Sequence, residues 1–134
     1  MPHLTVEYTG NIGPEARIGE LCTTLCELLR AQRGEDGVRL YPIGGTRVLA
    51  YPAAQWSVAD GGADRAFVYL NLRIAPGRPA AAIAATGDAL LAAVQRHFET
   101  LFAARPLGIT LQIDQGAPAY DAKHSNLHPL FAGT

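Results

Sequence analysis

The order in which short patterned segments follow one another constrains the fold of this chain more than any single motif does. Residues 3–8 alternate between apolar and polar side chains, which predicts a strand with one buried face. After a glycine-containing turn, a helix is predicted from Pro14 to near Gly34, because apolar side chains recur there at helical spacing. Residues 47–51 predict the next strand, so the first half reads strand, helix, strand.

The second half of the chain repeats this order. Residues 66–74 alternate more clearly than any other segment and predict a strand, which the Pro-Gly-Arg-Pro segment 76–79 ends before a second helix begins. That helix should stop at the Arg-Pro pair 105–106, because a residue before proline disfavours helical geometry. Residues 109–114 alternate again and predict the last strand, whereas the tail from Gln115 onward shows no period.

The repeated order predicts the fold class. Each half, about 1–60 and 61–134, can form a βαβ unit with a right-handed crossover. Two such units can join into a four-stranded mixed sheet with two helices on one face, an α/β (α+β) architecture in a single domain of residues 1–134. The other face of that sheet would stay uncovered, which predicts association with further subunits.

Composition excludes several classes of protein. Apolar residues make up 49% of the chain and charged residues 17%, which does not suit a disordered protein. The formal net charge of −1 gives no basic excess, so nucleic acid is not an expected partner. No apolar run is long enough to span a membrane and no secretion signal begins the chain, so we expect a cytoplasmic protein without a membrane partner. Cys22 and Cys26 are then expected to be thiols on the apolar face of the first helix.

The second residue can supply an unusual chemical group. Removal of Met1 would leave Pro2 as the amino terminus, and its nitrogen would become a secondary amine. An α-amino group titrates near ~7.7–8.0, and burial or nearby cations lower that pKa, which suits a general base at neutral pH. Many proteins begin with Met-Pro for no catalytic reason, so this feature alone leaves both interpretations open.

Several further segments stand in a characteristic order along the chain. They are residues 2–8 (PHLTVEY), 41–47 (YPIGGTR), 59–61 (ADG), 66–74 (AFVYLNLRI), 77–78 (GR) and 125–131 (SNLHPLF). Together they resemble the 5-carboxymethyl-2-hydroxymuconate isomerase family of the tautomerase superfamily, which includes 4-oxalocrotonate tautomerase and macrophage migration inhibitory factor. The similarity touches nearly the whole chain, although the helices contribute little specific identity.

The resemblance implies a function, a site and an assembly. It implies an isomerase with the tautomerase fold, in which the terminal Pro2 is the general base that moves a proton on a 2-hydroxydienoate to give the conjugated 2-oxo isomer. Arg47 and Arg78 match positions that bind carboxylates or the oxyanion, a role for which the planar, always charged guanidinium is suited. It further implies a small polycarboxylate substrate such as 5-carboxymethyl-2-hydroxymuconate, from homoprotocatechuate degradation, no cofactor or metal, and a homotrimer.

Other interpretations stay open. A superfamily relative that decarboxylates or dehalogenates its substrate would use the same proline in its protonated form, and a non-catalytic oligomeric ligand-binding protein could keep the fold. Leu49 stands where bacterial members carry a second basic residue, which puts the substrate in doubt.

Four further side chains carry expectations of their own. His124 and His128 are spaced for metal binding only if helical, and Pro129 beside them argues against that. His3 alternates away from Pro2 and is expected at a surface or interface, whereas Tyr8 shares the Pro2 face and could line the pocket.

Overall fold

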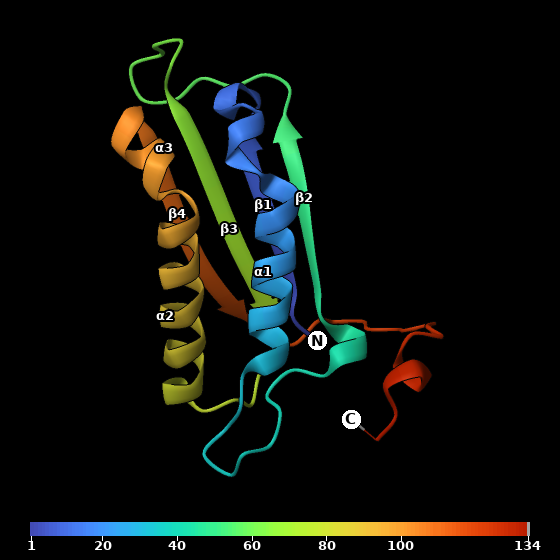
Figure 1. Cartoon of the computed structure of the whole chain (residues 1–134). Helices are drawn as coiled ribbons and strands as arrows, with labels where there is room; N and C mark the ends of the chain where they lie inside the picture. Colours follow the sequence, from blue (N-terminus) through green and yellow to red (C-terminus); the bar gives the residue numbers. More distant parts are fainter. Residues whose placement is uncertain (134) are drawn as a thin grey trace.

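The computed structural model of the chain describes residues 1–133, which form one mixed sheet covered on one face by helices (Figure 1). The strands are β1 His3–Thr9, β2 Arg47–Ala53, β3 Ala66–Ile74 and β4 Leu107–Gln115. The helices are α1 Ile18–Ala31, α2 Ala80–His97 and the short α3 Glu99–Ala104. The sheet order is β2-β1-β3-β4, in which the β1–β2 and β3–β4 pairs are parallel and the central β1–β3 pair is antiparallel. The predicted four-stranded mixed sheet with its helices on one face is therefore confirmed.

Alternation along the central strands places the core between sheet and helices. In β3, every even-numbered residue from Ala66 to Ile74 is buried, whereas the odd-numbered residues are half-buried or exposed. Leu4 and Val6 of β1 are fully buried on the same face. The helices supply the other half of the core through Leu21, Leu25, Leu29, Leu90, Val94 and Phe98. Burial of these side chains accounts for the docking of α1 and α2 on one face, because apolar burial is the dominant favourable contribution to folding.

The helices differ from the prediction at two points. The first helix does not begin at Pro14: residues Pro14–Ala16 form a 3-10 turn, and Arg17 takes a left-handed conformation (φ 48°, ψ 54°) that cannot continue into α1. The second helix is interrupted at Phe98 (φ −96°, ψ 9°), whose fully buried side chain lies between α2 and α3. The last helical turns therefore form a separate element.

The uncovered face of the sheet carries its own network of polar side chains. Tyr69 donates a hydrogen bond from its hydroxyl to Gln112 (2.6 Å), and Asn71 donates from its amide to Asp114 (2.8 Å). Leu49 and Tyr51 of β2 are 41% and 52% exposed on the same face. Within residues 1–133, no element packs over this face of the sheet (Figure 1).

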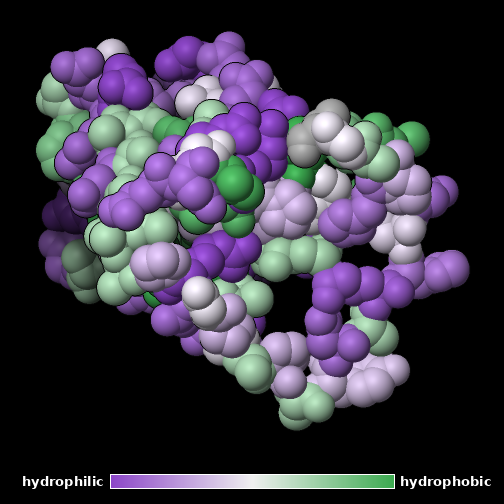
Figure 2. All heavy atoms as spheres, turned by 90° about the horizontal axis from the view of Figure 1, so that it is seen from below, coloured by the Kyte–Doolittle hydropathy of each residue, from purple (hydrophilic) through white to green (hydrophobic). Residues whose placement is uncertain are grey.

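One end of the sheet gathers segments that are far apart in sequence. β1 and β2 begin there and β3 ends there, because β1 runs parallel to β2 and antiparallel to β3. The chain after β4 passes this end, and its short 3-10 helix His128–Phe131 (η4) contacts the 3-10 helix Ile43–Gly45 (η3). A view from this end shows mostly hydrophilic residues with apolar groups set between them (Figure 2). Of the helices in residues 1–133, none combines the length and apolar character that a membrane crossing requires.

Candidate active site

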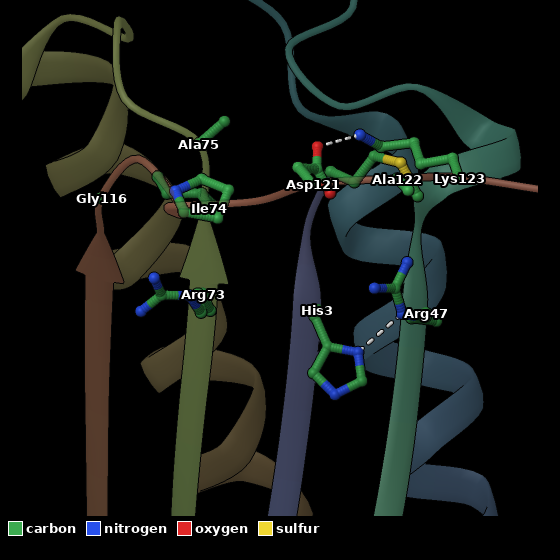
Figure 3. Close-up of a pocket in the computed structure, with 11 residues that line it drawn as sticks. His3, Arg47, Arg73, Ile74, Ala75, Gly116, Asp121, Ala122 and Lys123 are labelled. Atoms are coloured by element: carbon green, nitrogen blue, oxygen red, sulfur yellow. Dashed lines mark hydrogen bonds and ion pairs between the residues drawn. The ribbon is translucent and has the colours of Figure 1, made fainter.

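A pocket of about 410 Å³ opens at this end of the sheet (Figure 3). Its walls come from the start of β1 and β2, the end of β3 and the segment after β4. They are formed by Met1, His3, Arg47, Arg73, Ile74, Ala75, Gly116, Pro118, Asp121, Ala122 and Lys123. The pocket therefore brings together cationic side chains and the amino terminus.

Arg47 is held in the pocket by its neighbour on β1. His3 and Arg47 are paired residues of the β1–β2 ladder, and the Arg47 Nε donates to His3 Nδ1 over 2.7 Å. Partial burial and then the charge of Arg47 lower the pKa of His3, so the ring stays neutral and its Nδ1 can accept this bond. As expected, His3 lies on the face of β1 directed away from the core, where it is half-buried, and on this face it also lines the pocket.

The amino terminus lies in the same pocket. Burial and the charges of Arg78, Lys123 and Arg47, in that order, lower the pKa of the Met1 amino group, and Asp121 opposes them weakly. Pro2 is buried, and its carbonyl accepts a hydrogen bond from the Arg47 backbone N–H (3.3 Å). The surroundings of the Met1 amine thus shift its equilibrium toward the neutral form, which is the form that a general base requires.

Arg78 is not one of the residues that line this pocket. Its Nε and Nη2 donate to the Leu40 carbonyl (3.2 and 3.1 Å) and its Nη1 donates to the Ala75 carbonyl (3.2 Å). Its guanidinium also lies over the ring of the fully buried Tyr41, 4.7 Å from the ring centre. Of the two predicted arginines, the structure therefore places Arg47 on the pocket wall, while Arg78 acts on the amino terminus by its charge and lies outside the wall.

The segment after β4 adds residues that no sequence pattern had indicated. Lys123 and Asp121 form an ion pair on the pocket wall. Arg73 is also a wall residue that the sequence analysis did not select, although its alternation places it on the same sheet face as His3.

The remaining sequence predictions concern Tyr8, His128 and His124. Tyr8 is half-buried against the core at the opposite end of β1, so the expectation that it lines the pocket is wrong. His128 packs closely on η3, where a Cβ added to Gly44 would lie only 2.8 Å from the His128 Cα. His124 is exposed and lies on no helix, and in residues 1–133 no cluster of three or more His, Cys, Asp or Glu is placed to hold a metal ion.

Known proteins resemble the chain over its whole length. The sequence profile of a family described as 5-carboxymethyl-2-hydroxymuconate isomerase matches residues 2–131. A 5-carboxymethyl-2-hydroxymuconate Delta-isomerase of Escherichia coli is 30% identical over 131 residues, which cover 98% of this chain and 99% of that protein. A crystal structure of a 5-carboxymethyl-2-hydroxymuconate delta-isomerase superposes with a TM-score of 0.94 at 40% identity, covering 100% of this chain and 95% of that one. The corresponding isomerase of Deinococcus radiodurans R1 gives a TM-score of 0.86 at 39% identity over 97% of this chain and 93% of that one.

More distant structures identify the fold. A fused 4-OT wild type symmetric trimer superposes with a TM-score of 0.61 at 22% identity, covering 98% of this chain and 99% of that one. A macrophage migration inhibitory factor-like protein from Entamoeba histolytica gives 0.54 at 13% identity over 92% and 96% of the two chains. These likenesses show the tautomerase fold. The profile match and the close relatives establish that the chain is an isomerase belonging to the 5-carboxymethyl-2-hydroxymuconate isomerase family.

Proposed function

We propose that this isomerase uses the nitrogen of Pro2, freed by removal of Met1, as a general base on a 2-hydroxydienoate such as 5-carboxymethyl-2-hydroxymuconate. The observation that carries the proposal is the position of the chain terminus. It lies in a pocket with Arg47 and Lys123, where burial and cationic neighbours lower the pKa of its amine. Removal of one residue would leave the amine of Pro2, which is anchored to β2 through its carbonyl, at this same end of the sheet.

The proposed reaction moves one proton and needs no redox step. The neutral Pro2 nitrogen takes the proton of the 2-hydroxyl group, and the electron pair of that O–H bond forms the C2 carbonyl as the double bonds shift. The protonated amine then delivers a proton to C5, at the far end of the diene, which gives the conjugated 2-oxo-3-enoate. The substrate and product have the same atoms, and the amine returns to its neutral state without a metal or an organic cofactor.

Cationic side chains would stabilise the negative charge that develops in this reaction. Arg47 lies on the pocket wall, where its Nε donates to His3 and its Nη1 donates to the Gly45 carbonyl (3.3 Å). The N–H groups that these two bonds leave unused, those of Nη2 above all, are available to a carboxylate or to the developing oxyanion. Arg78 has three N–H groups bonded to backbone carbonyls. We therefore propose that the main role of Arg78 is to lower the pKa of the terminal amine by its charge. Its N–H groups that are not bonded to carbonyls can also bind a substrate carboxylate that reaches them.

We also propose that the protein assembles as a homotrimer. The sheet face opposite the helices carries exposed Leu49 and Tyr51, and a relative with this fold is a symmetric trimer. The pocket lies at the end of that same face through His3 and Arg47, so an adjacent subunit can complete it.

The proposal is tested by a spectrophotometric assay with 5-carboxymethyl-2-hydroxymuconate, run beside an intact-mass measurement of the same sample. We expect turnover in samples whose mass lacks Met1 and none in chains that retain it, because a retained methionine ties the Pro2 nitrogen into an amide. Full activity in chains that retain Met1 would refute the assignment of the base. Burial and the cations that lower the pKa of the Met1 amino group would act in the same direction on a Pro2 amine at this end of the sheet, which supports a neutral base rather than the protonated proline of a decarboxylase or dehalogenase.

A further inference from the structure

We propose that Arg73 is a second carboxylate-binding residue of this pocket, so that the site selects 2-hydroxydienoates with a carboxylate at each end of the diene. The inference rests on the proposed function and adds the residue that binds one carboxylate of its substrate. Arg73 has not been selected by any sequence pattern, and the two arginines that the family resemblance supplies are Arg47 and Arg78.

The register of the sheet places His3 between two arginines, one on each neighbouring strand. His3 pairs with Arg47 on β2 and with Arg73 on β3, so all three side chains stand in one row on the same face. Neighbouring strands lie ~4.7–4.9 Å apart, which puts the backbones of Arg47 and Arg73 roughly 10 Å from each other. Two arginine side chains that start from backbones at this separation can each bind one carboxylate of a diene that carries a carboxylate at each end.

The two guanidinium groups face different parts of the pocket. Figure 3 shows Arg47 directed toward the segment with Asp121 and Lys123, and Arg73 directed toward β4 and Gly116. A Cβ on Gly116 would lie 3.7 Å from the Arg73 Nη2, so the Arg73 guanidinium lies beside the segment that follows β4. The arrangement provides one cation for each end of an extended dicarboxylate.

Arg73 is also the wall cation that has no partner of its own. Lys123 pairs with Asp121, and Arg47 donates to His3. The acidic residue opposite Arg73 in the β3–β4 register is Asp114, but its carboxylate accepts the amide N–H of Asn71 (2.8 Å). Within residues 1–133, no hydrogen bond or ion pair is formed by the Arg73 side chain. An exposed guanidinium with all its donors free is suited to bidentate binding of a carboxylate.

The test compares two substrates that differ in one carboxylate. 2-Hydroxymuconate carries a carboxylate at both ends, whereas 2-hydroxypenta-2,4-dienoate carries only the one beside the hydroxyl group. In Arg73→Gln we expect kcat/KM for 2-hydroxymuconate to fall roughly 10- to 100-fold, mainly through KM, as expected for the loss of a charged hydrogen bond. The value for 2-hydroxypenta-2,4-dienoate should change less than about threefold, and Arg73→Lys should lie between wild type and Arg73→Gln. An equal effect on both substrates, or no effect on either, overturns the inference.

A control variant and a binding measurement separate this inference from its alternatives. Arg96→Gln changes an exposed arginine of α2 that does not line the pocket, and it should leave both kcat/KM values unchanged. A change in the oligomeric mass of Arg73→Gln would identify a subunit contact and would also overturn the inference.

Calorimetric titration with adipate and hexanoate gives a readout that is independent of turnover. We expect the wild type to bind adipate at least roughly tenfold more tightly than hexanoate, and Arg73→Gln to lose that preference. An adipate preference that survives in Arg73→Gln refutes the role of Arg73. If the wild type converts neither substrate but shows the Arg73-dependent preference, the inference holds while the proposed reaction fails.

Discussion

Arg47 Nε and His3 Nδ1 lie 2.7 Å apart, across the first rung of the parallel β1–β2 ladder. Because the arginine is always the donor, the histidine must be neutral with its proton on Nε2. This hydrogen bond therefore fixes the tautomer of His3, and together with the bond from Arg47 Nη1 to the Gly45 carbonyl it orients the Arg47 guanidinium.

Protonation of His3 should weaken substrate binding. The pKa of His3 is lowered by burial and by Arg47, so the acceptor is lost only as the pH falls below the usual histidine value. We expect the KM of the wild type to rise by roughly 3- to 10-fold in that acid range, because this change corresponds to the net free energy of one hydrogen bond. The other charged groups of this pocket are Arg73, Asp121, Lys123 and the terminal amine.

His3→Asn separates the histidine from these neighbours. Its amide oxygen can accept from Arg47 but does not titrate, so the acid rise in KM should disappear in the variant. KM is measured from acid to neutral pH for both proteins. If their KM–pH curves coincide, the bond does not orient Arg47 for the substrate.

Replacing the proposed base should remove most of the activity. In Pro2→Ala the ring that fixes the secondary amine is lost, and we expect kcat to fall by about 10²–10⁴-fold, the range attributed to general base catalysis. Pro76→Ala, in an exposed loop before α2, serves as the matched control and should retain kcat. Circular dichroism should show both variants folded. A Pro2→Ala enzyme with wild-type kcat would contradict the mechanism.

Arg78 should set the pH dependence of the reaction. Its charge is the largest cationic contribution that lowers the pKa of the Met1 amino group. The Pro2 amine freed by removal of Met1 would lie at the same end of the sheet, so Arg78→Gln should raise the pKa of that amine. A higher pKa means that more of the base is protonated at neutral pH. The acid limb of the kcat/KM profile should therefore move to higher pH, with activity recovered in alkaline buffer. Arg96→Gln should leave the limb in place, and a limb that moves to lower pH in Arg78→Gln would contradict the assignment.

The buried hydroxyl pair beneath Arg78 gives a stability prediction. Tyr41 and Thr86 are both fully buried, and their hydroxyl oxygens lie 3.0 Å apart. Tyr41→Phe should lower the free energy of unfolding by about 1–3 kcal/mol, because it leaves the Thr86 hydroxyl without this partner. The double variant with Thr86→Val should be less destabilised than the sum of the two single variants, measured by urea unfolding. Since Phe keeps a ring beneath Arg78, activity per folded molecule should not change in Tyr41→Phe.

Most of the fold could be predicted because the strands have one buried face. The alternation in residues 66–74 gives the bounds of β3 as the structure has them, since its even-numbered residues pack under the helices. The left-handed Arg17 and the break at Phe98 could not be predicted. Arginine gives no signal for a positive φ, and Phe98 continues the apolar pattern of the helix that it interrupts.

The site was less accessible from the sequence. The family resemblance indicates Arg47, which lies on the pocket wall. The alternation in residues 3–8 predicts that His3 is directed away from the core, but it does not predict that a pocket lies on that face. Arg73 shares that parity and could have been found once the β1–β3 register was known. Lys123 lies in a segment without period, and only the path of the chain after β4 brings it to the amino terminus.

The side chain of Met1 lines the pocket and packs against Gly45, where a Cβ would lie 2.8 Å from the Met1 Cγ. In a subunit that retains Met1, the methionine side chain thus occupies part of the pocket that the substrate would enter. If overexpression saturates the methionine aminopeptidase of the host, the preparation would be a mixture of subunits with and without Met1. The specific activity of such a preparation would then depend on the fraction of subunits that have lost Met1, as well as on the rate of the reaction.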